Sequence, residues 1–328
     1  MAHSRTSCLS GRTQPWAWAF KPAFAVLLLA VCYSPALKAQ QGEEPMTPAA
    51  HVARNRALIS DAARLKLNPV QIGGLWAQIA SDYQDLSQFA EAEAAYNRAL
   101  ALLELESAGQ KAYAVTLSNL GSLYTMTGNF DAAENCNRRS LAVLEKLGDP
   151  LMVARAQWHL ADVYLAMGRN KDALRYSSLA VQAVATLPGA TSDDNGSMLI
   201  SYAYASCLTS HCDEGLRAAR EAIGIVLTSF APESFPAGQA HVALGYVEGK
   251  AGEAAAADED LREGVRILRM QLPASHPLMI HALELYREYL VGNHRDAEAK
   301  RIAQEQKAVD KGNSCSGCTV SVYGLRIQ

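Results

Sequence analysis

Bulky apolar residues recur three and seven positions apart along most of the chain after residue 73, with a small residue among them. Residues at this spacing lie on one face of a helix, and the small residue lets a neighbouring helix approach closely. The small position recurs with nearly constant spacing, at Ala80, Gly121, Ala161, Ala203 and Gly245. A sixth unit falls at Arg287, where the small residue has been lost. The pattern predicts a series of similar helix pairs.

The residues around the small position repeat as well. The first unit reads Trp76-x-x-Ile79-Ala80-x-x-Tyr83, and Ala92-x-x-x-Tyr96 follows in its second helix. This pattern resembles the tetratricopeptide repeat, whose period is 34 residues. The period of about 41 residues here is similar to that of the longer, kinesin-light-chain type of repeat. The resemblance implies an all-α fold, a right-handed superhelical solenoid of antiparallel helix pairs.

Four segments are predicted along the chain: a signal peptide, an N-terminal cap helix, about six helix pairs and an extended C-terminal tail. Asn68 and Pro69 are expected to end the cap helix, and Val320, Val322 and Leu325 alternate as an extended segment does. The predicted boundaries are 1–39, 40–72, 73–309 and 310–328.

The N-terminal segment 1–39 differs from the rest of the chain. Basic residues precede an apolar run from Pro22 to Cys32, and Leu37-Lys38-Ala39 resembles a cleavage site, so the segment is interpreted as a secretory signal. The protein is therefore expected in the periplasm or outside the cell, with no membrane span after cleavage. An uncleaved anchor and a lipid anchor at Cys32 are the alternatives. Removing four bases and no acid changes the formal charge from −3 to −3 − 4 = −7.

Composition and motifs argue against several function classes. A nearly neutral chain lacks the basic surface that nucleic acid requires, so nucleic acid is not an expected partner. The stretch Gly245-x-x-x-Gly249-Lys250 is too short for a phosphate-binding loop and lacks its Ser or Thr. No serine-hydrolase or zinc-protease motif occurs. We expect no catalytic residue, no cofactor and no metal.

The cysteines leave two features open. Cys207, His211 and Cys212 resemble part of a metal site, but a closed zinc site needs four ligands, so a buried cysteine and turn residues are the alternative. Cys315 and Cys318 can close a small disulfide in an exported protein. Thiol exchange by this pair is the competing enzymatic hypothesis.

The resemblance also implies a binding surface, because in this family the first helix of every pair lines the inside of the superhelix. Aromatic residues there are candidates for contacts that carry binding energy; filling the bend between adjacent helices is the alternative. Of the positions that match a chaperone-type carboxylate clamp, only Asn119 keeps the expected residue, and Arg155 keeps the charge. The candidate binding residues are Asn119, Arg155, Trp158, His159, Asp162, Tyr204 and Tyr246.

The sequence thus predicts a non-catalytic scaffold of a bacterial cell envelope that binds a protein or peptide in its groove. The alternatives are thiol–disulfide activity and an assembly subunit that associates with itself.

Overall fold

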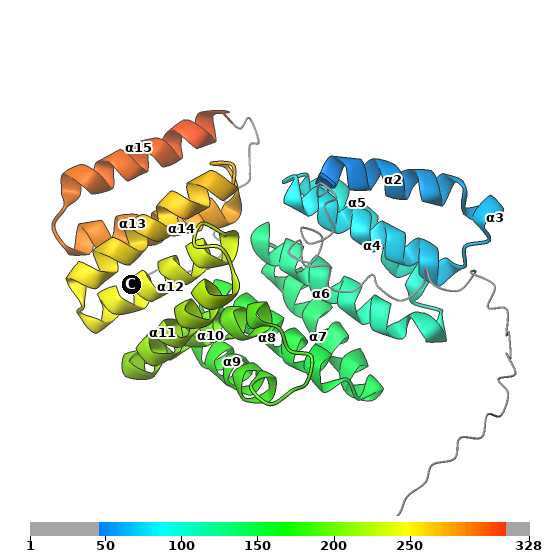
Figure 1. The fold of residues 1–328 in the computed structure, drawn as a ribbon, viewed down its shortest axis with the longest axis horizontal. Helices are drawn as coiled ribbons and strands as arrows, with labels where there is room; N and C mark the ends of the chain where they lie inside the picture. The colour runs from blue at the N-terminus through cyan, green and yellow to red at the C-terminus, as the bar shows by residue number, and fades with distance from the viewer. Residues whose placement is uncertain (1–45, 313–328) are drawn as a thin grey trace, which may run out of the picture. The chain divides into compact units, whose positions relative to one another are not determined.

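The computed structural model describes residues 46–312, with side chains to residue 306. The described residues form helices without strands (Figure 1). The helices are α2 (Pro48–Ser60), α3 (Ala62–Leu65), α4 (Pro69–Asp85), α5 (Phe89–Leu103), α6 (Gln110–Met126), α7 (Phe130–Leu147), α8 (Pro150–Ala166), α9 (Asn170–Val184), α10 (Ser192–Leu208), α11 (Cys212–Ser229), α12 (Phe235–Ala251), α13 (Ala254–Gln271), α14 (Pro277–Gly292) and α15 (Asp296–Gly312), with a short 3₁₀ turn, η2 (Ser107–Gly109).

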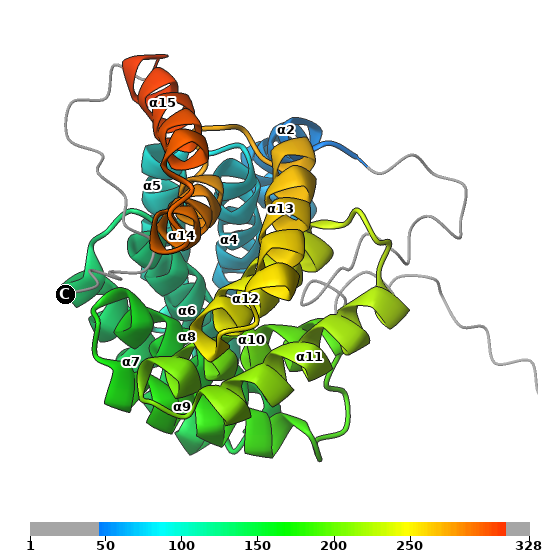
Figure 2. The ribbon, with the colours of Figure 1, turned by 90° about the vertical axis from the view of Figure 1, so that its left-hand side faces the viewer.

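From α4 onward the helices form six consecutive antiparallel pairs, visible from two directions in Figures 1 and 2. The even-numbered first helices, α4 to α14, pack against their own second helices, α5 to α15. Each second helix also packs against the first helix of the next pair. The predicted all-α solenoid of helix pairs is confirmed.

The first boundary between elements differs from the expected one. Asn68 caps α4 rather than ending the preceding helix: its side chain accepts from Gln71 N, the Gln71 side chain accepts from Asn68 N, and Pro69 is the first helical residue. The expected single cap helix is broken at Asp61 into α2 and α3, and α2 packs on α4. At the other end, α15 continues to Gly312, and residues 313–328 lie outside the described part.

The turn inside each pair places one residue in the left-handed region. Glycine occupies this position in three pairs, as Gly128, Gly168 and Gly252, with φ between 70° and 85°. In the other three pairs the residues are Ser87, Ser210 and His294, with φ between 56° and 69°. The turn geometry therefore repeats in all six pairs, although the glycine signal appears in only half of them.

The core consists of clusters distributed along the array. The largest runs from Leu160 in α8 to Ile302 in α15, and a second runs from Val52 in α2 to Cys136 in α7. Ala80, Ala161 and Ala203 are fully buried, as their role at the helix crossing requires. The stability of each pair thus depends on its neighbours.

A polar contact recurs between successive pairs. In α7, Glu134 accepts a hydrogen bond from the Tyr164 hydroxyl of α8 (2.9 Å), and Arg138 donates to the same hydroxyl (2.7 Å). Arg169, at the start of α9, also pairs with Glu134. Because Glu134 lies in the second pair and both partners lie in the third, this contact fastens one pair to the next.

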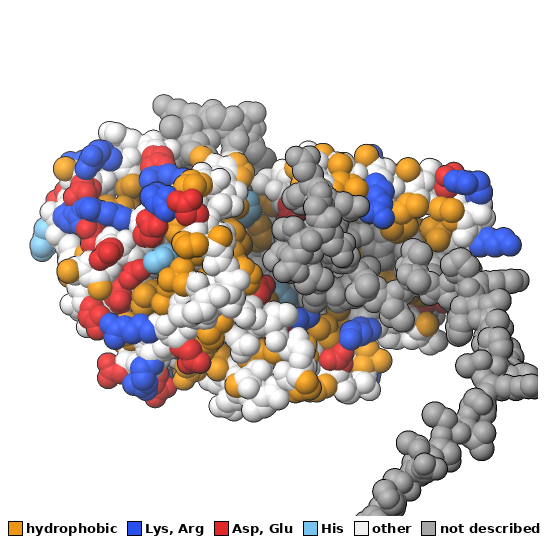
Figure 3. Space-filling view, viewed as in Figure 1, with side chains coloured by type: hydrophobic (Ala, Val, Ile, Leu, Met, Phe, Trp, Pro, Cys, Tyr) orange, Lys and Arg blue, Asp and Glu red, His pale blue; other side chains and the backbone are white. Residues whose placement is uncertain are grey.

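The same arrangement returns between the fifth and sixth pairs. Arg262 in α13 donates to the Tyr286 hydroxyl (2.9 Å), and Arg295, at the start of α15, pairs with Asp258. Basic and acidic side chains lie close together in this part of the molecule, on the left of Figure 3. Within the described chain, the fourth pair uses Arg220 in a similar way, pairing it with Glu253.

The space around two helical glycines predicts opposite effects for their Gly→Ala substitutions. A Cβ at Gly245 would lie 2.8 Å from the Leu261 backbone N and 3.0 Å from Ala257 O, so backbone would have to move. We expect Gly245→Ala to lower the free energy of unfolding by about 1–3 kcal/mol. Gly224 is a matched control in α11, because a Cβ there meets nothing within 4 Å. Gly224→Ala should raise stability by about 0.5–1 kcal/mol through helix propensity, and urea unfolding of both variants measures the contrast. Equal effects would contradict the close approach.

Candidate functional site

Successive first helices contact one another directly along the array. We call the side on which they meet the first-helix face; it is formed by α4, α6, α8, α10, α12 and α14. Side chains one repeat apart in sequence therefore become neighbours on this face. All seven candidate binding residues come from its helices, α6, α8, α10 and α12.

Polar side chains link neighbouring first helices in a nearly continuous series. Ser122 in α6 hydrogen-bonds His159 Nδ1 in α8 (3.1 Å), and Trp158 Nε1 in α8 donates to Ser201 Oγ in α10 (2.9 Å). Further along, Lys250 Nζ in α12 donates to Glu288 Oε1 in α14 (2.9 Å). Much of the polar chemistry of this face is therefore used to join its helices.

Arg155 is also part of this series. Its guanidinium makes two hydrogen bonds to the Asp194 carboxylate in α10, at 2.6 and 2.7 Å, and both side chains are largely buried. The Arg155 guanidinium holds the pKa of Asp194 low despite its burial. Asp194 thus occupies the bidentate edge of the Arg155 guanidinium. Asn119 is half-buried in α6.

Asp162, two turns after Arg155 in α8, has a different environment. Its Oδ1 accepts a hydrogen bond from Ser201 Oγ (2.5 Å), the same hydroxyl that accepts from Trp158. Burial raises the pKa of Asp162 to about 7, and the Ser201 hydrogen bond opposes this rise only in part. His159, stacked on Trp158 with ring centroids 4.5 Å apart, has its pKa lowered to about 4, by burial and by the Arg155 charge.

The two candidate tyrosines lie inside the row of first helices. Tyr204 in α10 and Tyr246 in α12 are 7% and 5% exposed, with ring centroids 5.2 Å apart. This geometry corresponds to the alternative in which rings fill the space between adjacent first helices. Trp158 is half-buried, so more of its surface than theirs is accessible to a partner.

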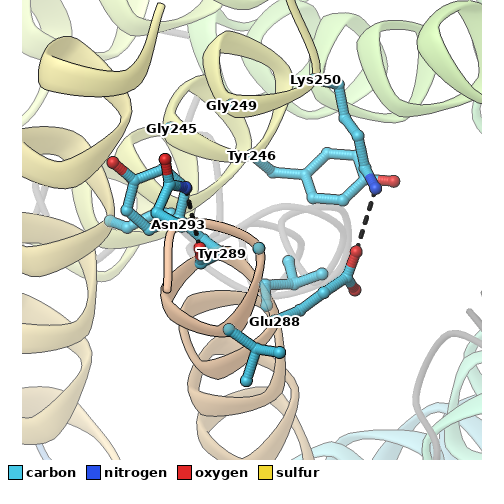
Figure 4. Close-up of a pocket in the computed structure, with 11 residues that line it drawn as sticks. Gly245, Tyr246, Gly249, Lys250, Glu288, Tyr289 and Asn293 are labelled. Carbon is cyan, nitrogen blue, oxygen red and sulfur yellow. Dashed lines mark hydrogen bonds and ion pairs between the residues drawn. The ribbon is translucent and has the colours of Figure 1, made fainter. Parts of the chain in front are cut away.

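A pocket opens where the C-terminal halves of α12 and α14 face each other (Figure 4). Its volume is about 430 Å³, within the range of small ligand sites. Sequence reasoning identified Tyr246 but missed the pocket, because its walls come from three helices. The lining residues are Gly245, Tyr246, Gly249, Lys250, Leu261, Leu285, Glu288, Tyr289, Val291, Gly292 and Asn293.

The cysteines of the fourth pair form a bond that sequence reasoning missed. Cys207, near the end of α10, and Cys212, the first residue of α11, are joined by a disulfide across the turn at Ser210. In this bonded form neither sulfur is a thiolate ligand for a metal. Within residues 46–312 no group of three or more His, Cys, Asp or Glu residues is placed to hold a metal ion. Cys315 and Cys318 lie outside the described residues.

The described part of the chain has no helix with the length and apolar character that a membrane span requires. The predicted signal peptide lies outside the described residues.

Comparisons with known proteins give one family and several similar folds. Residues 71–146 match the family model described as tetratricopeptide repeat. No curated protein matches the chain. BtubC (BKLC) from P. vanneervenii is 20% identical, with 69% of this chain and 92% of that chain covered and a TM-score of 0.55.

Two further solved structures have higher TM-scores but lower identity. The apo form of RapI is 11% identical, with 84% of this chain and 94% of that chain covered and a TM-score of 0.65. A Rap protein complexed with competence and sporulation factor is 12% identical, with 84% and 90% covered and a TM-score of 0.59. At these identities the similarity shows the fold alone.

Asp162 makes the stability of the array depend on pH. Its pKa is about 7 in the folded chain, against about 3.9 in an unfolded one. Between pH about 4 and pH about 7 the Asp162 carboxyl is therefore protonated in the folded chain and ionised in the unfolded chain. The contribution of Asp162 to the free energy of unfolding falls as pH rises through this range. Asp162→Asn cannot ionise. We expect it to gain about 1–3 kcal/mol relative to wild type between pH 5 and pH 8, measured by urea unfolding at both pH values. A stability difference independent of pH would show that Asp162 titrates normally.

Proposed function

We propose that this chain, a tetratricopeptide-repeat protein by its matched repeats and its fold, is a non-catalytic protein-interaction scaffold of a bacterial cell envelope. Its first-helix face binds a peptide or helix of a partner protein. The fold supports this proposal because stacked helix pairs present extended binding surfaces. Among the similar structures, one Rap protein is complexed with competence and sporulation factor.

The observation that carries the proposal is the unbalanced charge of the first-helix face. Lys111, Arg155 and Lys250 are each paired with a carboxylate of a neighbouring first-helix element. In contrast, Asp85, Asp193 and Glu284 have no ion-pair partner among the described residues. Arg287 in α14 also makes no ion pair within the described chain, and its charge acts on Glu284, so the first helices keep more unpaired acidic groups than unpaired basic ones.

The pKa shifts of these three carboxyls have the same direction. Burial raises the pKa of Asp85, and the charge of Asp82 adds to the rise. Burial also raises the pKa of Asp193, with Asp194 adding and Arg155 opposing. For Glu284 burial raises the pKa and Arg287 opposes it in part. A basic segment lying on this face would stabilise all three ionised groups, so we infer that the partner segment is basic.

We also propose that the chain is exported to the periplasm or beyond. The basic and apolar character of segment 1–39 supports export, and so does the disulfide between Cys207 and Cys212, because disulfides persist in oxidising compartments.

Charge reversal tests the binding proposal. An Asp85→Lys, Glu284→Lys double variant should lose most capture of partners from an envelope fraction, because it places like charges against a basic segment. A matched control is Glu91→Lys with Glu221→Lys, which changes the net charge equally at exposed positions on α5 and α11. We expect capture by wild type to weaken with added salt. Equal capture by both double variants, measured by quantitative mass spectrometry, would refute binding on the first-helix face.

The disulfide tests the proposed compartment. We expect a Cys207–Cys212 cross-linked peptide in a non-reducing digest of protein recovered from the envelope fraction, identified by mass spectrometry. We expect Cys207→Ser with Cys212→Ser to lower the free energy of unfolding by about 2 kcal/mol, given the short loop that the bond closes. Recovery of the native protein only from the cytosol, with both thiols reduced, would contradict export.

A further inference from the structure

The pocket between α12 and α14 contains one polar group that the protein itself does not satisfy. Tyr246 is 5% exposed, and its hydroxyl is buried without a hydrogen-bond partner among the described residues. A buried polar group without a partner is costly to the folded protein. The hydroxyl is therefore a hydrogen-bonding group that the described chain leaves unused.

Each of the other polar side chains that line the pocket makes a contact within the chain. Lys250 pairs with Glu288, as the dashed line in Figure 4 shows. The Tyr289 hydroxyl donates to Ala254 O (2.5 Å), and Asn293 Nδ2 donates to Tyr289 O (2.9 Å). Because the lysine and glutamate neutralise each other, the pocket carries no net charge and favours a neutral occupant.

The rest of the lining is apolar or lacks side chains. Leu261, Leu285 and Val291 provide aliphatic walls, and Gly292 leaves open space, since a Cβ there would meet nothing within 4 Å. A volume of about 430 Å³ is at the small end of ligand sites. It suits one side chain with its flanking backbone better than a large cofactor.

The state of the Tyr246 hydroxyl defines the complementary group. Burial, and next the negative charge of Glu288, raise its pKa, so the phenol remains protonated and can donate. In Figure 4 the Tyr246 ring extends from α12 toward Lys250 and Glu288, beside the gap between the two helices. The natural acceptor for a neutral donor of this kind is a carbonyl oxygen.

We propose that this pocket receives a neutral apolar side chain of a bound protein segment, and that Tyr246 donates a hydrogen bond to a backbone carbonyl of that segment. The inference rests on the proposed function, because the pocket lies on the first-helix face and would seat one residue of the basic segment. It adds a specificity element: charge attracts the segment, and the pocket selects an apolar residue within it.

Blocked amino acids test the pocket without knowledge of the partner. N-acetyl-phenylalaninamide carries an apolar side chain and two amide carbonyls, and binding can be followed by methyl NMR of Leu261, Leu285 and Val291. We expect saturable shifts of these methyl groups in the millimolar range. N-acetyl-lysinamide and the N-acetyl-aspartamide anion should not produce them, because the pocket carries no net charge and its Lys250 and Glu288 already pair with each other.

Three variants separate the pocket from the fold. Tyr246→Phe should bind the phenylalanine probe about tenfold more weakly while remaining at least as stable, because it removes an unsatisfied hydroxyl and no packing. Gly292→Leu should abolish binding by filling the open space. Tyr202→Phe is the matched control and should bind as wild type does, because the Tyr202 hydroxyl bonds Glu214 outside the pocket.

Several results would overturn the proposal: no saturable shift with the phenylalanine probe, equal binding of the charged probes, or undiminished binding by Tyr246→Phe. These results do not depend on Asp85 or Glu284. A failure of the pocket proposal can therefore be distinguished from a failure of the proposed binding on the first-helix face.

Discussion

Each helix of the array is stabilised by burial against its immediate neighbours, and this constraint shapes the rest of the structure. Two antiparallel helices cannot enclose a core, so each pair must leave an apolar side for the next. At Ala80, Ala161 and Ala203 the side chain is small enough for a neighbouring helix to cross closely, and all three residues are fully buried. The apolar residues therefore form clusters along the chain, and every unit contributes to the stability of the units beside it.

Burial brings pairs together without setting their relative orientation, because apolar attraction has no direction. The polar contacts between pairs supply that direction. The Tyr164 hydroxyl is held between Glu134 and Arg138, and Arg169 joins the same carboxylate. These contacts bind the turn between α8 and α9 to α7, the second helix of the preceding pair. Between the third and fourth pairs, Leu174 takes the place of Glu134 and packs in the core. The disulfide from Cys207 to Cys212 then strengthens the fourth pair internally.

The fold could be predicted because its determinants are local and periodic. Small residues at nearly constant intervals identify the helix crossings. Glycines identify half of the turns within pairs. The turns at Ser87, Ser210 and His294 have the same backbone geometry but no glycine that would indicate it in the sequence. The contacts on the first-helix face were harder to predict, because they join residues from different repeat units. Nothing near Arg155 in sequence indicates that Asp194, in the next unit, occupies its guanidinium. Likewise, Cys207 and Cys212 form a disulfide because the tight turn between α10 and α11 brings them together.

One position of the repeat shows how this architecture can acquire a binding site. The residue after the small position faces the neighbouring first helix, and it changes along the array from Ser122 to Asp162, Tyr204 and Tyr246. In the middle units these side chains contact one another or the next helix, as the Asp162–Ser201 bond and the paired tyrosine rings do. At α14 the corresponding residue is Glu288, which extends to Lys250 instead of filling the space beside Tyr246. The residue at one repeated position thus contributes to the wall of a pocket, and the fold tolerates this because the neighbouring helix pairs still pack on one another.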